Sequence, residues 1–315
     1  MAEIGKKGSK KSKELKGRNC LLTGAASGIG RSLAFCLARE KVNLFLADID
    51  MENLEKVKKE LEPLGIKVFT GKCDVSSYED FEQLAKEVYS KFGDLDILIN
   101  NAGIGCGGYV ETMELVDWKH VLDINLWSII YSIKVFLPRT LERGTGYIIN
   151  TGSGAGIVGL PNHIPYVTSK FAVVGISEAL YSELSDRGID VSVICPTVIK
   201  TNIIDRSSVE IPLNLLVGDE KEKTAKLEEF KKIFWEIYTR KSLTPDQAAK
   251  KYIKGIKKRK LYIFDKSILP FAQFLKSFSQ SLYKRILRKE GSDFRSQIDE
   301  ALTKMGLKPR EEIRG

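Results

Sequence analysis

The sequence offers little that could bind a metal ion or form disulfide bonds. Its five cysteines (Cys20, Cys36, Cys73, Cys106 and Cys195) are odd in number and widely spaced. They show neither the C-x-x-C spacing of a zinc site nor the paired framework of small secreted domains. We therefore expect no metal site, and a protein that works in the reducing cytoplasm.

Long apolar runs are also absent. No run reaches the ~20 residues of a membrane-spanning helix, and the basic N-terminus lacks the apolar segment of a secretory signal. Hydrophobic residues make up 43% of the chain, which is normal for a soluble globular protein. A chain of 315 residues is long enough for one large domain or two small ones with a sizeable core.

The net charge of +9 is unevenly distributed. Residues 1–18 carry a charge of +5 and residues 250–315 carry +11, so the body between them carries −7. An acidic body argues against a core that binds nucleic acid. The basic ends are expected either to meet an anionic surface or to remain solvated. Residues 1–17, rich in Lys, Gly and Ser, are expected to be a disordered tail.

A glycine-rich turn follows the first apolar run of the body. Residues 19–23 are apolar, the turn runs Gly24-Ala-Ala-Ser27-Gly28-Ile29-Gly30, and a periodic segment follows at 31–40. This order predicts a strand, a turn and a helix. Such glycines let backbone approach a pyrophosphate, and the helix N-terminus offers it unpaired N–H groups. The spacing is T-G-x-x-x-G-x-G rather than G-x-G-x-x-G, and glycine turns also occur without a ligand.

A second strand at 42–47 ends at Asp48. An acidic residue about twenty positions after such a turn can accept hydrogen bonds from ribose hydroxyls. The alternative is that Asp48 caps a helix starting near Met51. Ser27, not a basic residue, precedes Gly28. A 2′-phosphate would lack a cation there, so NAD is favoured and NADP is the alternative.

The alternation of strands and helices continues along the chain. Further strands are expected at 66–70, 95–99, 147–151, 189–194 and 261–264, and helices at 78–92, 116–137 and 166–187. Near-continuous apolar strands alternating with helices predict an α/β fold, a doubly wound parallel sheet of the Rossmann type. Ligands of such sheets bind beyond the carboxyl ends of the strands.

Tyr166 and Lys170 are four residues apart, so they lie on one face of the predicted helix. At a separation of about 5 Å and an effective dielectric of about 20, their attraction is roughly 3 kcal/mol. We expect this to lower the pKa of Tyr166 towards working pH, so that it exchanges a proton with an alcohol or ketone oxygen. Ser153, just after a strand, could hold the same oxygen. By itself the pair is common on helix surfaces. His163 is interpreted as a loop residue rather than a pocket residue.

In order and spacing, these motifs resemble the short-chain dehydrogenase/reductase family. The resemblance rests on the glycine turn, Asp74, Asn100-Asn-Ala-Gly103, Asn125, Ser153 and the Tyr166-x-x-x-Lys170 pair, and covers about residues 17–202, more loosely to 264. It implies a catalytic tetrad of Asn125, Ser153, Tyr166 and Lys170. Cofactor contacts are implied for Gly24, Ser27, Gly28, Ile29, Gly30, Asp48, Asp74, Val75, Asn101, Ala102, Gly103, Tyr166, Lys170, Val198 and Thr201.

The resemblance also implies roles for these residues. Tyr166 would exchange the substrate proton, and Lys170 would hold the nicotinamide ribose. Asn125 would hold a water in a proton relay. Relatives usually form dimers or tetramers through the helices that hold Asn125 and Tyr166. One departure is Thr197, where the family usually has glycine after proline, so the backbone contacts there are less certain.

The C-terminal third departs most from the family. A substrate lid is expected at about 201–240, rich in apolar residues (Ile203, Ile204, Val209, Ile211, Leu213, Leu215, Leu216). An apolar lid favours a hydrophobic substrate, lipid-like or steroid-like, although these residues could simply pack on the core. Thr244-Pro-Asp-Gln247 has the residues of a capping box and predicts a helix start. The catalytic domain is expected to span residues 18–265.

Residues 266–315 are expected to form a basic, amphipathic helical extension. Apolar residues fall on one helical stripe, and basic residues flank it: Phe271, Phe274, Leu275, Phe278, Leu282 and Ile286, with Lys276, Lys284, Arg285, Arg288 and Lys289. Over 268–289 such a helix could lie on an anionic membrane. It could equally pack on the core, over the pocket or across a dimer. A nucleotide-binding sensor without turnover is the remaining alternative to an enzyme, and the complete tetrad argues against it.

Overall fold

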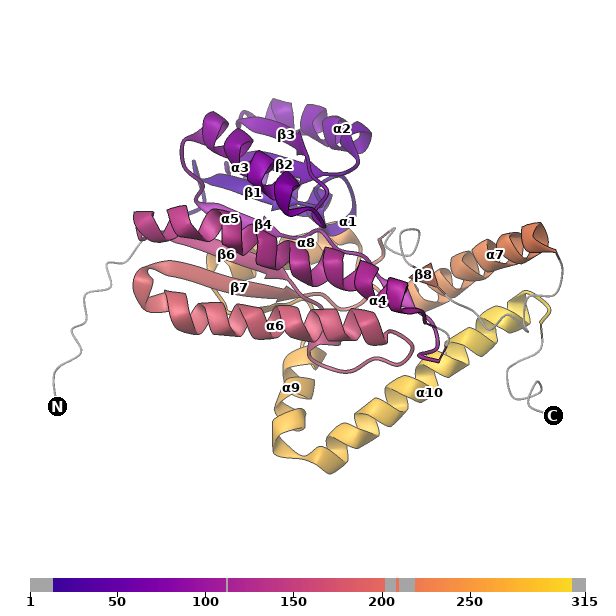
Figure 1. The fold of residues 1–315 in the computed structure, drawn as a ribbon. Coiled ribbons are helices and arrows are strands. Elements are labelled where there is room, and N and C mark those ends of the chain that lie inside the picture. The colour runs from indigo at the N-terminus through magenta and orange to yellow at the C-terminus, as the bar shows by residue number, and fades with distance from the viewer. Residues whose placement is uncertain (1–13, 112, 202–207, 210–218, 308–315) are drawn as a thin grey trace, which may run out of the picture.

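A seven-stranded parallel sheet forms the centre of the protein in a computed structural model that describes residues 14–111, 113–201, 208–209 and 219–307 (Figure 1). The strand order is β3-β2-β1-β4-β6-β7-β9. The strands are β1 (Asn19–Thr23), β2 (Asn43–Asp48), β3 (Val68–Lys72), β4 (Ile97–Asn100), β6 (Gly146–Thr151), β7 (Ile189–Cys195) and β9 (Tyr262–Phe264). The chain crosses over between β3 and β4, which confirms the predicted doubly wound fold.

Helices cover both faces of the sheet. One face carries α1 (Gly28–Arg39), α2 (Met51–Leu61) and α8 (Pro245–Lys257), and the other carries α3 (Tyr78–Phe92), α5 (Ser128–Arg143) and α6 (Ile164–Leu184). Side chains of successive strand residues point to opposite faces of the sheet. Leu22 packs in the core of the first face, and Leu21 packs in the core of the second face. Burial on both faces explains why the strands are apolar throughout.

The core also reaches back into the predicted N-terminal tail. Leu15 is buried in the first-face core, and the Gly17 N–H donates to the Lys41 carbonyl at 2.8 Å. Residues 1–13 lie outside the described part of the chain. The predicted tail boundary at residue 17 was therefore too late by several residues.

A chain of buried polar side chains crosses the middle of the sheet. Asn100 on β4 donates to Asn150 on β6 at 2.9 Å and accepts from Ser132 on α5 at 2.7 Å. Asn150 in turn donates to Ser177 on α6 at 3.0 Å. Each buried amide thus has a partner, as the cost of burying an unpaired polar group demands. The network ties two strands to α5 and to α6, the helix that holds Tyr166 and Lys170.

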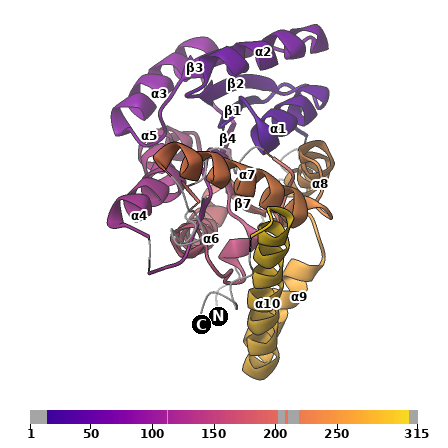
Figure 2. The same cartoon turned by 90° about the vertical axis from the view of Figure 1, so that its right-hand side faces the viewer.

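The segment Leu115–Arg143 is long and apolar enough to span a membrane by length and composition, contrary to the sequence analysis. It comprises α4 (Leu115–Leu122), a π turn (Asp123–Trp127) and α5. Here it belongs to the helical layer, because α4 packs on α6 and α5 packs on α3 (Figure 2). Asn125 lies within the π turn and is buried.

The capping box predicted for α8 is confirmed. The Gln247 N–H donates to the Thr244 hydroxyl, and the Thr244 N–H donates to the Gln247 side chain at 3.0 Å. Residues 202–207 and 210–218 of the expected lid, which include every apolar residue named above for it except Val209, lie outside the described chain. The described parts of this region are β8 (Ser208–Val209), which pairs with β5 (Cys106–Gly107), and α7 (Glu220–Thr239).

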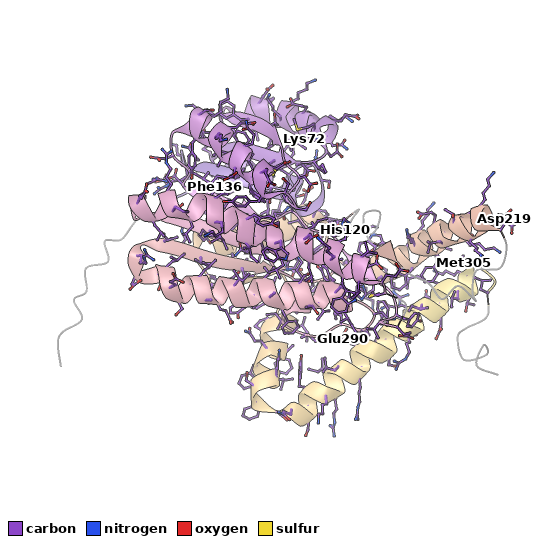
Figure 3. The ribbon with its side chains drawn as sticks, viewed as in Figure 1. Lys72, His120, Phe136, Asp219, Glu290 and Met305 are labelled. Carbon is purple, nitrogen blue, oxygen red and sulfur yellow. The ribbon has the colours of Figure 1, made fainter. Side chains whose placement is uncertain are left out.

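The C-terminal extension is two helices rather than one stripe. The chain bends at Ser279 between α9 (Ile268–Phe278) and α10 (Gln280–Lys304). Leu275, expected on the stripe with Phe271, is buried, whereas Phe271 is exposed. In Figure 1 the two helices form a V below the sheet, and α10 returns to α7. The two helices meet through Phe230 and Phe234 of α7 and Phe294 and Leu302 of α10; Figure 3 labels Asp219 at the start of α7 and Met305 at the end of α10.

The polar network across the sheet generates a stability prediction. Asn150→Leu removes the acceptor of the Asn100 amide and leaves that donor buried and unpaired. We expect the free energy of unfolding to fall by about 1–3 kcal/mol, measured by urea denaturation. The control Asn53→Leu, on the exposed face of α2, should change it by less than about 0.5 kcal/mol. Equal effects of both substitutions would contradict a special role for the network.

Candidate active site

Two adjoining cavities open at the carboxyl edge of the sheet. The smaller has a volume of about 280 Å³ and follows β1, β2 and β4. Nearly all residues predicted to bind cofactor line it: Gly24, Ser27, Gly28, Ile29, Gly30, Asp48, Asp74, Val75, Asn101, Ala102, Gly103, Tyr166, Lys170 and Thr201. Val198 lines the larger cavity instead.

The glycine turn is shaped by close backbone packing. Gly24 has a φ of +65°, and a Cβ on it would lie 2.7 Å from the Ala102 Cα. A Cβ on Gly30 would lie 2.0 Å from the Gly24 carbonyl oxygen. The Asn101 side chain fastens the turn by donating to the carbonyls of Thr23 and Gly24, both at 3.1 Å. Only glycine fits these positions, so the turn presents bare backbone to the cavity.

Asp48 is held at the end of β2 with its carboxylate braced by backbone. Its oxygens accept from the Ala26 N–H at 2.9 Å and the Asp50 N–H at 3.1 Å. Asp50, not Asp48, caps α2 by accepting from the Asn53 N–H. The capping alternative for Asp48 is therefore wrong. A fixed carboxylate at this edge has the chemistry that a ribose diol requires, and this lining fits a dinucleotide.

Tyr166 and Lys170 lie in the first turns of α6, and Ser153 follows β6. The Lys170 Nζ donates to the Thr151 carbonyl at 3.1 Å and lies 5.6 Å from the centre of the Tyr166 ring. The Ser153 hydroxyl accepts from the Ala155 N–H at 3.1 Å. Tyr166 lines both cavities, so the structure brings the three predicted side chains together.

Burial dominates the titration of this pair. It raises the pKa of the Tyr166 phenol above its usual value, and the hydrogen bond with Ser153 only partly opposes this. Burial also lowers the pKa of Lys170 to about 8. The expected fall in the pKa of Tyr166 is therefore wrong for the protein alone, because desolvation by burial outweighs the hydrogen bond with Ser153. Neutral Tyr166 is suited to donating a proton to a ketone oxygen.

Asn125 does not form the site directly but holds the residues around it in place. Its amide donates to the Ile104 carbonyl at 3.0 Å and to the Ser169 hydroxyl at 3.1 Å, and its oxygen accepts from the Ile104 N–H at 2.9 Å. A Cβ on Gly103 would lie 3.0 Å from this oxygen and 3.4 Å from the Lys170 Nζ. Asn125 thus fixes the loop after β4 beside Lys170. Its role in a proton relay stays a prediction.

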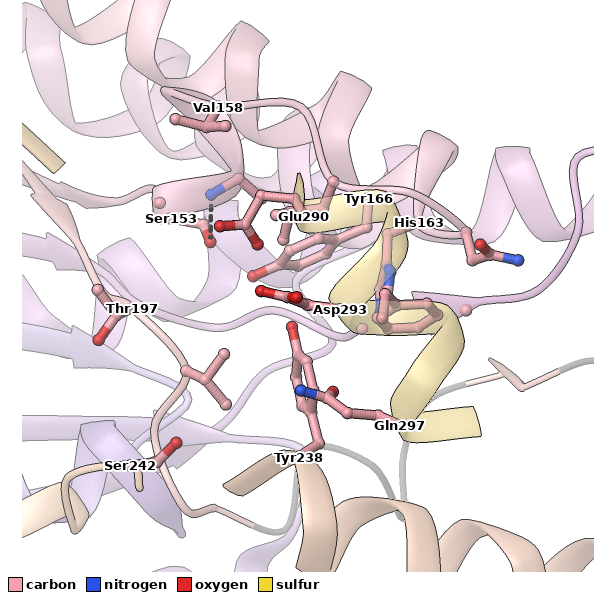
Figure 4. Close-up of a pocket in the computed structure, with 18 of the residues that line it drawn as sticks. Ser153, Val158, His163, Tyr166, Thr197, Tyr238, Ser242, Glu290, Asp293 and Gln297 are labelled. Carbon is pink, nitrogen blue, oxygen red and sulfur yellow. Dashed lines mark hydrogen bonds between the residues drawn. The ribbon is translucent and has the colours of Figure 1, made fainter. Parts of the chain in front are cut away.

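The larger cavity, about 710 Å³ in volume, lies on the other side of Tyr166 (Figure 4). Its walls combine the end of β6 with α7, α9 and α10. Most of the lining is apolar or aromatic, including Val158, Leu160, Phe230, Phe234, Trp235, Tyr238, Leu269, Ala272, Ile286, Phe294 and Ile298. The sequence analysis missed the aromatic face of α7, although Phe230, Phe234 and Tyr238 recur at the helical spacing of four.

Two carboxylates from α10 give this cavity a polar wall. Glu290 and Asp293 point towards the space beside Tyr166 and Tyr238 (Figure 4). Partial desolvation, and then the neighbouring Asp293, raise the pKa of Glu290. Burial is the first cause of the raised pKa of Tyr238, followed by Glu290 and Tyr166. Lys241, Lys266 and Lys289 line the same cavity, so its charged groups are of both signs. The sequence analysis did not anticipate either carboxylate.

His163 was expected to be a loop residue away from the pocket, and this expectation is wrong. It stands at the start of α6 and lines the larger cavity. Its Nδ1 lies 2.7 Å from the Pro161 carbonyl, and its ring meets Phe294 edge to face at 5.2 Å. Burial lowers the pKa of His163, so the ring is a neutral part of the wall.

Thr197, the departure from the family pattern, is anchored by an acidic residue that the sequence analysis did not identify. The Thr197 N–H donates to Asp265 at 2.9 Å, and its hydroxyl contacts the same carboxylate at 2.5 Å. Asp265 is buried just after β9. Nearby, the Trp235 indole donates to the Thr201 carbonyl at 3.0 Å. The turn after β7 is thus held by side chains rather than shaped by a glycine.

Comparisons with known proteins agree with this geometry. The sequence model of the short chain dehydrogenase family matches residues 18–210. A cyclohexanol dehydrogenase of Acinetobacter sp. is 38% identical over 58% of this chain and 74% of its own length. The putative oxidoreductase SadH of Mycobacterium tuberculosis is 32% identical over 77% and 83%. A short chain dehydrogenase/reductase of Burkholderia phymatum, solved in complex with NAD, is 29% identical with a TM-score of 0.73, covering 85% of this chain and 96% of its own.

The position of Tyr166 generates a prediction about chemistry. Tyr166→Phe removes the proton that the phenol exchanges, so kcat should fall by roughly 10²–10⁴, while the dissociation constant for NAD stays nearly unchanged. Lys170→Ala should impair both, because the ammonium lines the cofactor cavity. Steady-state kinetics and calorimetric titration with NAD measure the two effects.

The matched control is Tyr181→Phe, on the exposed part of the same helix, which should leave kcat unchanged. Retention of more than about a tenth of kcat by Tyr166→Phe would contradict its assignment as the proton-transfer group.

Proposed function

Because the chain belongs to the short-chain dehydrogenase/reductase family of oxidoreductases acting on CH–OH groups, we propose that it transfers a hydride between NAD and a hydrophobic secondary alcohol or ketone. One observation carries the proposal. Tyr166 lines both the cavity of the glycine turn and the larger apolar cavity. A substrate oxygen at the phenol would therefore have its carbon at the junction with the cofactor site.

The roles of the residues follow from this placement. Tyr166 donates a proton to a ketone oxygen or accepts one from an alcohol. Ser153, which hydrogen-bonds the phenol, holds the same oxygen. The protonated Lys170 ammonium favours the phenolate form of Tyr166. Because the pKa of Lys170 is about 8, the charge of Lys170 changes near working pH. Bound NAD supplies the hydride acceptor at its nicotinamide.

The preference for NAD over NADP rests on Asp48 and Ser27. Asp48 is buried, with its carboxylate at the cavity wall. Ser27, which starts α1, supplies no positive charge beside it. A 2′-phosphate would meet a fixed negative charge, whereas a free diol would find two hydrogen-bond acceptors. The cytoplasm, with its NAD pool, is the location that we infer for this activity.

The hydrophobic substrate is inferred from the larger cavity. Aromatic residues of α7, among them Phe230 and Phe234, and Leu269 of α9 line it. The carboxylates of Glu290 and Asp293 are offset by three lysines in the same lining, so the inference rests on the aromatic and aliphatic walls. Similarity to a cyclohexanol dehydrogenase supports an uncharged alcohol. The same complete cavity argues against a sensor without turnover, because sensing a nucleotide requires no substrate chamber.

We also infer a homodimer or homotetramer, with contacts through α4, α5 and α6. Exposed apolar side chains on these helices support it. Leu115 and Val116 on α4 are exposed, as are Trp127 in the π turn and Tyr181 on α6. Exposed apolar surface of this kind marks interaction sites when it is contiguous. Sedimentation analysis of the purified protein measures the state directly.

The cofactor assignment predicts a clear preference. Wild-type protein should show a higher kcat/KM with NAD than with NADP. Asp48→Ala should lower kcat/KM with NAD and reduce the ratio of the two kcat/KM values. Asp50→Ala is the matched control, because it removes a carboxylate two residues away that caps α2 and should leave the preference intact. A wild-type preference for NADP would overturn the role given to Asp48.

The substrate assignment predicts a dependence on apolar size. In a series of 2-alkanols of increasing length, kcat/KM should rise by about threefold to fourfold for each buried CH₂, corresponding to ~0.8 kcal/mol. Phe234→Ala should flatten the rise, because it removes part of the wall, whereas Trp127→Ala, outside the cavity lining, should not. A flat or falling series in the wild type would argue against a hydrophobic substrate.

A further inference from the structure

We propose that the bend between α9 and α10 docks on an anionic lipid surface and brings one wall of the larger cavity close to it. The elbow is defined here as residues 268–289. It projects beyond the rest of the described chain, as the V in Figure 1 shows. The part of the proposal that concerns substrate entry rests on the proposed function, whereas docking itself does not.

The first observation is a helix with two apolar faces. One face of α9 is buried, because Leu269, Ala272 and Leu275 pack towards the sheet. The opposite face remains exposed, with Phe271 at 53%, Phe274 at 58% and Phe278 at 73% exposure. Within the described chain, α9 packs on the core through its buried face. Its exposed face therefore makes no packing contact there.

The exposed side chains are contiguous. Ile268, Phe271, Phe274 and Phe278 follow one another at spacings of three or four residues, which places neighbouring members on one surface along α9. Leu282 is exposed just beyond the bend. The rings of Phe274 and Phe278 stack with centroids 5.3 Å apart. Aromatic and aliphatic side chains grouped in this way are typical of helices that enter the boundary between lipid headgroups and acyl chains.

The second observation is charge of one sign around this apolar surface. Residues 266–289 contain six Lys/Arg residues and no Asp or Glu. Lys284, Arg285, Arg288 and Lys289, in the first turns of α10, are exposed. Lys276 lies over the ring of Phe171 at 4.5 Å. Anionic headgroups complement such a rim, and each basic residue near the surface strengthens binding about fivefold.

The charge also distinguishes lipid from a second copy of the chain. A symmetric dimer through the elbow would bring two basic rims together, because the same patch meets itself. The like charges would oppose that contact, and no acidic residue in 266–289 could pair with them. An anionic lipid surface would attract the basic residues rather than repel them. We therefore propose lipid as the binding partner of the elbow.

The third observation links the elbow to the cavity. Ile268, Leu269, Ala272, Ile286 and Lys289 belong both to the elbow and to the lining of the larger cavity. Docking would therefore place the cavity wall at the lipid surface. A hydrophobic alcohol or ketone could then enter from the bilayer without crossing water.

The experiment is sedimentation of full-length protein with vesicles of phosphatidylcholine containing about 30% phosphatidylserine, without cofactor or substrate. Wild-type protein should sediment with these vesicles at low salt, bind pure phosphatidylcholine far more weakly, and be released at high salt. The triple variant Phe271→Ser, Phe274→Ser, Phe278→Ser should lose at least tenfold in binding. Lys284→Glu with Arg285→Glu should lose a similar factor on the anionic vesicles.

The matched control is Leu115→Ser with Val116→Ser, which removes exposed apolar side chains of α4, remote from the elbow, and should leave vesicle binding unchanged. Truncation before α9 is a poor test, since it would uncover the core around Val173 and Val193. Equal vesicle binding by the triple variant and wild type would overturn the proposal. So would dissociation of an oligomer by the triple variant in the absence of lipid, because the occupant would then be a second copy.

Activity on a short, water-soluble alcohol without vesicles separates docking from the proposed function. The triple variant should retain it, because Phe271, Phe274 and Phe278 are not among the residues that line the cavity. Loss of vesicle binding with retained activity supports docking. Absence of any dehydrogenase activity in the wild type would count against the proposed function alone.

Discussion

A parallel sheet places the carboxyl ends of its strands along one edge, and the chemistry of this protein depends on that constraint. The glycine turn after β1, Asp48 at the end of β2, the loop after β4 and Ser153 after β6 are far apart in sequence but meet there. Helix α6 then begins at the same edge and brings Tyr166 and Lys170 to it. The sheet edge and α6 together therefore position the predicted catalytic groups, and no separate element has to carry them to the site.

The desolvation of this edge has two opposing effects. Burial raises the pKa of the Tyr166 phenol, so the phenol keeps its proton. Burial lowers the pKa of the Lys170 ammonium, so the ammonium loses its proton more easily. Ser153 pulls the tyrosine pKa the other way through its hydrogen bond. Burial is the larger effect, so the phenol keeps its proton in the protein alone.

The sequence predicted the fold and the tetrad because both depend on local patterns. Apolar strands, the glycine turn and the spacing of Tyr166 and Lys170 are readable within a few residues. The cavity walls are not, because they arise from pairing between segments distant in sequence. Phe294 of α10 meets Phe234 of α7 with ring centroids 5.4 Å apart, and Thr197 binds Asp265. The break at Ser279 was missed for a similar reason, since periodicity continues across it while the two helices pack on different neighbours.

The joint between α7 and α10 has a consequence for local stability. The cluster around Phe230, Phe234, Phe294 and Leu302 is separate from the cores on either face of the sheet. A unit held by its own small core can open at a cost below that of global unfolding. The roof of the larger cavity can thus loosen as a cooperative piece while the dinucleotide edge stays folded. Substitutions in this cluster would alter the lifetime of the closed chamber more than the architecture of the sheet.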